Sequence, residues 1–129
     1  SDCAVPAKGY WFRPTLFTGV AQSSRIVKEE IFGPVLCAMP FSSEEEVIKN
    51  ANNSIYGLAA GVWTKDISKA HRVSNKLRTG TVWVNCYNVF DAALPFGGYK
   101  QSGWGREMGF EALKLYTETK SVCIDLSSK

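Results

Sequence analysis

Cysteine and histidine side chains, which could act as nucleophiles or hold a metal ion, are few and scattered along the 129 residues. They are Cys3, Cys37, Cys86, Cys123 and His71. No CxxC pair occurs, and a zinc site needs closer pairs or more imidazoles, so we predict no metal site. Cys86 follows an apolar run and has neither a histidine nor an acidic residue beside it to activate its thiol. We therefore interpret Cys86 as a packed core thiol rather than a nucleophile.

The stretch from Tyr87 to Gly105 has the composition of a ligand-binding loop. It combines four glycines, Gly97, Gly98, Gly103 and Gly105, with aromatic residues that include Phe90, Phe96, Tyr99 and Trp104. Loops of this length are uncommon in a compact domain unless they have a function. Glycines allow the backbone to approach a ligand closely, and aromatic rings supply apolar walls. An ordinary surface loop with aromatic residues tucked beneath it is the alternative interpretation.

Composition indicates one modest globular domain, with 45% hydrophobic and 21% charged residues. The net charge of +3 comes from 15 basic and 12 acidic residues that form no basic run, so we expect no nucleic-acid partner. The longest apolar runs, such as residues 57–63, are too short to span a membrane, and we expect no membrane partner. We expect free thiols, although the four cysteines could form two disulfides in a secreted protein.

Strand-like and helix-like segments alternate along the chain, which indicates the α/β class. Two helices have clear starts, because Ser42 can cap the first while Glu45 reaches back, and Asp66 can cap the second. Two further helical segments are expected at 25–29 and at 106–119. The expected strands are 10–17, 35–41, 58–64, 81–86 and 121–126.

Apolar spacing predicts which faces of the later elements are buried. The helix after Asp66 presents apolar residues at helical intervals, and the helix at 106–119 does the same. In the last strand, alternate residues share one face. These positions are, in chain order, Ile67, Ala70, Val73, Leu77; Phe110, Leu113, Tyr116; and Val122, Ile124, Leu126.

Four motifs, in order, give the chain a specific resemblance. They read EEIFGPV at 29–35, NN-x-x-YGLAAGVWT at 52–64, GTVWVNCY at 80–87 and PFGGYKQSGWGRE at 95–107. With them the chain resembles the aldehyde dehydrogenase superfamily over roughly residues 9–126. The resemblance implies part of a catalytic domain over about 9–120, a Rossmann-like open sheet with flanking helices. It also implies an oligomerisation strand at 121–126, in a homodimer or homotetramer.

The resemblance assigns cofactor-binding roles to Glu30 and Phe32. Glu30 would bind the nicotinamide ribose of NAD, with NADP left open, and two carboxylate oxygens suit two vicinal hydroxyls. Phe32 would lie beside the nicotinamide ring. Without the resemblance, solvated surface carboxylates are the better interpretation of Glu29 and Glu30.

Substrate-pocket roles are implied for Phe90 and Phe96, which would line an aldehyde tunnel, and for Asn88 near its mouth. Aromatic walls hold a carbon skeleton and exclude water. Either phenylalanine could instead be plain core. Glu107 corresponds to a family glutamate that could lie on a proton path or form a structural salt bridge.

The implied reaction is oxidation of an aldehyde to a carboxylic acid through a cysteine thioester, with NAD as the hydride acceptor. The contexts of the family's nucleophile and general base, G-Q-x-C and E-L-G-G, do not occur here. We therefore expect a C-terminal portion that has no catalytic residue and is inactive alone. A non-catalytic assembly module is the alternative. Betaine, retinal, aliphatic and aromatic aldehydes all fit these motifs. A cytoplasmic location is expected, with mitochondria or another organelle left open.

Overall fold

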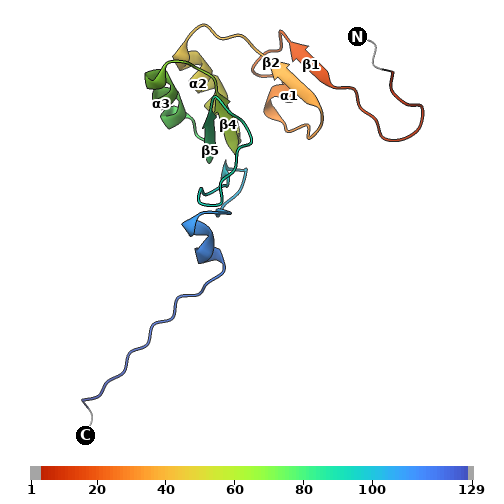
Figure 1. The fold of residues 1–129 in the computed structure, drawn as a ribbon. Helices are drawn as coiled ribbons and strands as arrows, with labels where there is room; N and C mark the ends of the chain where they lie inside the picture. The colour runs from red at the N-terminus through yellow and green to blue at the C-terminus, as the bar shows by residue number, and fades with distance from the viewer. Residues whose placement is uncertain (1–3, 128–129) are drawn as a thin grey trace. The chain divides into compact units, whose positions relative to one another are not determined.

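The computed structural model describes residues 4–127, and the chain divides into two compact units, Ser1–Ile55 and Tyr56–Lys129. Each unit contains a pair of parallel strands whose connection carries a helix (Figure 1). A strand, a crossover helix and a parallel strand form the repeating unit of open α/β sheets. The predicted α/β class is confirmed. In the described residues the strands form three two-stranded ladders.

In the first unit, β1 (Thr15–Thr18) pairs in parallel with β2 (Val35–Ala38), and Thr15 lies opposite Val35. The short helix α1 (Arg25–Lys28) lies in their connection. Both strands are shorter than the segments 10–17 and 35–41 that the sequence predicts. Pro14 directly precedes β1, and Pro40 lies two residues after the end of β2. Proline lacks a backbone N–H, so both residues lie at the end where the observed strand is shorter than the predicted one.

Helix α2 (Glu44–Asn52) begins one residue later than the sequence predicts, because Ser43 is its N-cap. The Ser43 side chain accepts a hydrogen bond from the Glu46 backbone N–H at 3.1 Å. The Glu46 carboxylate in turn accepts one from the Ser42 backbone N–H at 2.8 Å. The predicted pair, Ser42 with Glu45, is therefore wrong by one position. Ser-Ser followed by three glutamates permits either register, and Ile48 is the residue of this helix that is buried.

In the second unit, β4 (Ala59–Val62) and β5 (Thr81–Val84) are parallel and joined by α3 (Ile67–Lys76). The predicted Asp66 cap is confirmed, since its side chain accepts from the Lys69 backbone N–H at 3.0 Å. Ala70 and Val73 are buried as predicted, whereas Ile67 is exposed. A short antiparallel pair, β3 (Tyr56–Gly57) and β6 (Tyr99–Lys100), ties the later loop to the beginning of the unit.

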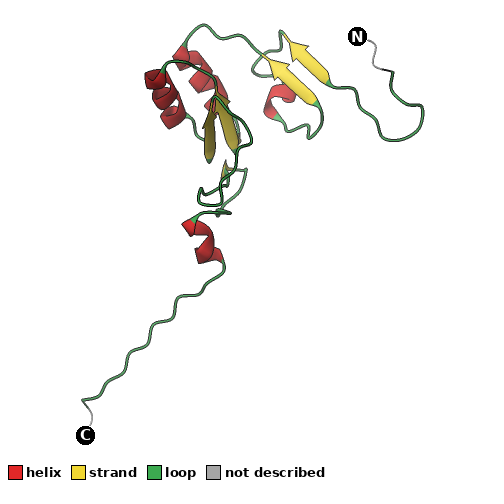
Figure 2. Ribbon diagram, in the orientation of Figure 1, coloured by secondary structure: helices red, strands yellow, loops and turns green. Residues whose placement is uncertain are grey.

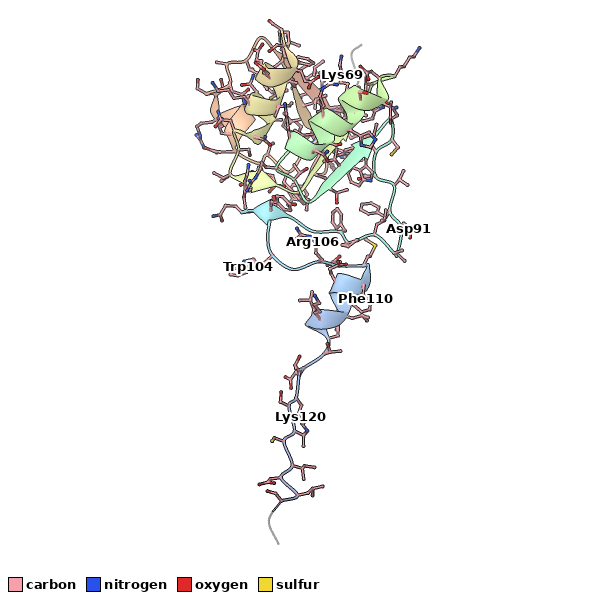
Figure 3. The ribbon with its side chains drawn as sticks, turned by 90° about the vertical axis from the view of Figure 1, so that its left-hand side faces the viewer. Lys69, Asp91, Trp104, Arg106, Phe110 and Lys120 are labelled. Atoms are coloured by element: carbon pink, nitrogen blue, oxygen red, sulfur yellow. The ribbon has the colours of Figure 1, made fainter. Side chains whose placement is uncertain are left out.

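The predicted helix over 106–119 is wrong: a 3-10 helix, η1 (Phe110–Leu115), occupies part of it. Met108 and Gly109 have φ of 58° and 62°, and left-handed residues interrupt a right-handed helix. Phe110, Leu113 and Tyr116, predicted to point inward, are exposed in this chain. Figure 3 shows Phe110 on this helix.

The segment 121–126, predicted as a strand, forms no ladder with any described residue, and Figure 2 draws it as loop. A strand is defined by a hydrogen-bonded partner, and the described part of the chain supplies none. Within the described residues, no helix combines the length and apolar character needed to cross a membrane.

Candidate functional site

Glu29 and Glu30 are adjacent carboxylates with different surroundings. Arg25 donates two hydrogen bonds to Glu29, from Nε to Oε1 at 2.8 Å and from Nη2 to Oε2 at 2.9 Å. These hydrogen bonds hold the pKa of the Glu29 carboxyl below its usual value, although the pair is exposed to solvent. Glu30 has no hydrogen bond or ion pair with any residue between 4 and 127. Glu30 is therefore the carboxylate available to a ligand.

Phe32 has a backbone conformation that bulky residues rarely adopt. Its φ is 51°, in the left-handed region, and 93% of its surface is exposed. Both features are unfavourable, because the backbone is strained and a large apolar ring faces water. Strain that a structure retains at an exposed aromatic residue suggests contact with a ligand or another part of the protein.

Glu30 and Phe32 lie beside the same hollow in the first unit, which has a volume of about 430 Å³. Its other walls come from α1, from β2 and from the residues beside them, and include Ile26, Glu29, Val35 and Cys37. A free carboxylate next to an apolar ring suits a ligand that pairs vicinal hydroxyls with a flat ring. The residues present therefore fit the ribose and nicotinamide end of NAD.

Phe90 and Phe96 contact each other edge to face, with ring centroids 5.1 Å apart and an interplanar angle of 82°. Phe90 also meets Trp83 at 5.6 Å, and Trp83 meets Tyr87 at 5.0 Å. The two predicted substrate residues thus belong to one aromatic cluster that extends from β5 into the loop. Sequence reasoning missed Trp83 and Tyr87, although both stand in the GTVWVNCY motif.

Asn88, predicted near the mouth of a substrate tunnel, is exposed, and its φ is 56°. Asparagine adopts this left-handed conformation more readily than most residues, so it suits the turn after β5. Asp91 lies farther along the same loop (Figure 3). The structure thus places Asn88, Phe90 and Phe96 on one loop, where the rings of the two phenylalanines are in contact.

Glu107 fixes Phe96 through its backbone. Phe96 N donates to Glu107 O at 2.8 Å and Glu107 N donates to Phe96 O at 2.7 Å. The Glu107 side chain is exposed and has no ion pair with the described residues, so the salt-bridge alternative has no support within them.

Arg106 closes the glycine-rich part of the loop, a role that sequence reasoning did not identify. Its Nη1 donates to Gly98 O at 3.1 Å and to Gly105 O at 2.6 Å. Its guanidinium also lies 5.5 Å from the centre of the Tyr99 ring. Trp104, by contrast, projects into solvent (Figure 3). Trp104 is therefore the most exposed of the loop aromatics.

The thiols of Cys37, Cys86 and Cys123 are free, and Cys3 lies outside the described residues. Cys86 is half-buried, and Cys37 donates weakly to Ile26 O at 3.7 Å. No cluster of metal-ligating side chains occurs in residues 4–127.

Comparisons with known proteins agree with these features. The sequence profile described as the aldehyde dehydrogenase family matches residues 3–122. DhaS of Bacillus subtilis strain 168, named as an aldehyde dehydrogenase, is 61% identical over 118 residues, which are 92% of this chain and 24% of DhaS. Human aldehyde dehydrogenase 1A1 is 56% identical over 122 residues, 95% of this chain and 24% of that protein.

A solved structure is similar in fold as well as in sequence. The NAD+ complex of aldehyde dehydrogenase from Bacillus cereus matches with a TM-score of 0.90 and 60% identity, over 95% of this chain and 25% of that one. The chain therefore spans about a quarter of the length of the relatives that it matches.

Proposed function

The chain belongs to the aldehyde dehydrogenase family, and from that membership we propose that it is the C-terminal quarter of an enzyme that oxidises an aldehyde to a carboxylic acid with NAD. The observation that carries the proposal is the family match over residues 3–122. The NAD+ complex of the Bacillus cereus relative supports the choice of cofactor.

Glu30 and Phe32 hold the nicotinamide end of the cofactor in this proposal. The Glu30 carboxylate accepts hydrogen bonds from the two ribose hydroxyls, and the negative charge makes those bonds stronger than neutral ones. Phe32 lies against the nicotinamide ring and limits its orientations. NAD, when bound, supplies the acceptor for the hydride that leaves the substrate carbon.

Phe90 and Phe96 form one wall of the substrate site. Their edge-to-face contact presents an apolar surface on which the carbon skeleton of an aldehyde can pack. Such a wall also excludes bulk water from a reactive thioester. The nucleophile and the general base belong to the part of the protein outside this chain, so the described residues bind and orient.

The test is NADH formation by the complete protein with acetaldehyde, benzaldehyde and betaine aldehyde. We expect turnover of at least one aldehyde, with one NADH formed for each carboxylic acid. The isolated 129-residue chain is expected to give none. If the complete protein binds NAD and assembles but oxidises no aldehyde, the non-catalytic assembly module replaces our proposal. If the isolated chain shows turnover that Cys86→Ser abolishes, Cys86 is the nucleophile and our account of the chain is wrong.

A further inference from the structure

Trp83 is the one aromatic side chain in the buried core of the described residues, with 7% of its surface exposed. It lies on β5, directly before the loop that carries Phe90 and Phe96. A tryptophan is large enough to pack against a core on one side and a loop on the other, while its N–H seeks a partner.

The indole of Trp83 holds the loop in two ways. Its Nε1–H donates a hydrogen bond to the Val89 carbonyl oxygen at 2.7 Å. Its ring meets Tyr87 and Phe90 edge to face, and the Phe90 contact is nearly perpendicular at 88°. Trp83 therefore fixes both the backbone just before Phe90 and the ring of Phe90 itself.

The far end of the loop is fixed independently of Trp83. The backbone of Phe96 is joined to Glu107, and Gly109 N donates to Ala92 O at 2.9 Å. Phe96 is thus held through its backbone, whereas Phe90 depends on ring contacts with Phe96 and with Trp83. Removing the Trp83 anchor should therefore move Phe90 and leave Phe96 in place.

We propose that Trp83 is a positioning residue that sets substrate selectivity by fixing Phe90 in the wall of the aldehyde site. The inference rests on the proposed function, because Phe90 must face the aldehyde. An aromatic aldehyde is large enough to pack on Phe90, whereas acetaldehyde gains little from that wall. Trp83 therefore favours aromatic aldehydes over small ones without touching either.

The decisive variant is Trp83→Phe in the complete protein, which keeps an aromatic ring but removes the hydrogen bond to Val89 O. Trp11→Phe is a matched control, because the Trp11 indole also donates to a backbone carbonyl, Lys8 O, at 2.8 Å in the other unit. Losing one such bond corresponds to roughly threefold to tenfold in an equilibrium constant. We expect Trp83→Phe to raise KM for benzaldehyde by about that factor relative to KM for acetaldehyde. The kcat for acetaldehyde and the kinetics of Trp11→Phe should change little.

A purely structural role would lower activity toward both aldehydes in parallel, and that result overturns the inference, as does an unchanged KM ratio. If Trp83→Phe does not fold, Tyr87→Leu decides, because Tyr87 is exposed and contacts the Trp83 ring. A smaller shift of the KM ratio in the same direction supports the inference, and no shift refutes it. If the wild-type protein oxidises neither aldehyde, the proposed function itself fails. If the wild-type protein oxidises both aldehydes and the variant leaves the KM ratio unchanged, only the inference about Trp83 fails.

Discussion

At the scale of single residues, the candidate cofactor site depends on how two neighbouring carboxylates differ. Glu29 and Glu30 look equivalent in the motif EEIFGPV, yet α1 ends beside them and brings Arg25 to Glu29. Arg25 and Glu29 are four residues apart, which is the spacing of neighbours on a helix surface. The ion pair engages both Glu29 oxygens, whereas Glu30 has no partner among the described residues and lies on the hollow beside Phe32.

We predict that Glu30→Gln in the complete protein weakens NAD binding by roughly fivefold, because a neutral amide oxygen makes weaker hydrogen bonds to the ribose hydroxyls. Glu29→Gln is the matched control, with the same change of charge one residue away, and should leave the Kd nearly unchanged. Calorimetric titration with NAD, which does not depend on turnover, measures both. Equal losses in the two variants would mean that only net charge matters, and no loss in Glu30→Gln would remove its ribose role.

At the scale of elements, the sequence correctly predicted the segments that are determined by neighbouring residues, such as a helix cap or a β-branched run. Asp66 caps α3, Ala70 and Val73 face inward, and β5 coincides with the β-branched run near Trp83. The predictions failed where the deciding partner lies far away or outside the chain. The strand at 121–126 has no partner among the described residues.

The candidate site shows the same division between local and distant causes. The loop after β5 and its aromatic content follow from composition alone. Contact between Phe90 and Phe96 could not be predicted, because it depends on the backbone pairing of Phe96 with Glu107, eleven residues later. Nor could helical spacing over 106–119 reveal the left-handed conformation of Met108, which interrupts that helix.

We predict that Ser43→Ala destabilises the first turn of α2 by about 1 kcal/mol, because the Glu46 N–H loses its side-chain acceptor. Ser42→Ala should have little effect, since the hydrogen bond from residue 42 to Glu46 uses the backbone N–H, which alanine keeps. Hydrogen exchange of α2 amides in the complete protein is the measurement. Protection should fall about fivefold in Ser43→Ala. If Ser42→Ala loses the protection instead, the cap register predicted from the sequence is right and the observed one is wrong.

At the scale of the whole molecule, far more large apolar side chains are exposed than are buried among the described residues. Four hydrophobic residues are buried in the described chain: Ile48, Ala70, Val73 and Trp83. Many large apolar residues are exposed on elements of both units, among them Leu16 on β1, Leu36 on β2 and Leu115 on η1. An apolar surface of this kind is normally covered by another part of the protein or by a partner. The chain spans about a quarter of its relatives, and the remaining polypeptide of those relatives is long enough to cover such a surface.

The segment 121–126 exposes both apolar side chains and an unpaired backbone. Val122, Ile124 and Leu126 alternate along it and are 72%, 73% and 89% exposed. None of its backbone groups is hydrogen-bonded to another described segment. An alternating segment with unpaired N–H and C=O groups favours pairing with another chain.

We predict that removing residues 121–129 from the complete protein lowers its oligomeric state or causes aggregation, and that the isolated 129-residue chain self-associates. Sedimentation velocity on both proteins is the test. Replacing Val122, Ile124 and Leu126 with threonine keeps β-propensity and removes apolar area. This variant therefore separates the contribution of backbone pairing to assembly from that of apolar burial. A monodisperse, folded monomer for the isolated chain, together with an intact oligomer after the deletion, would show that this segment does not drive assembly.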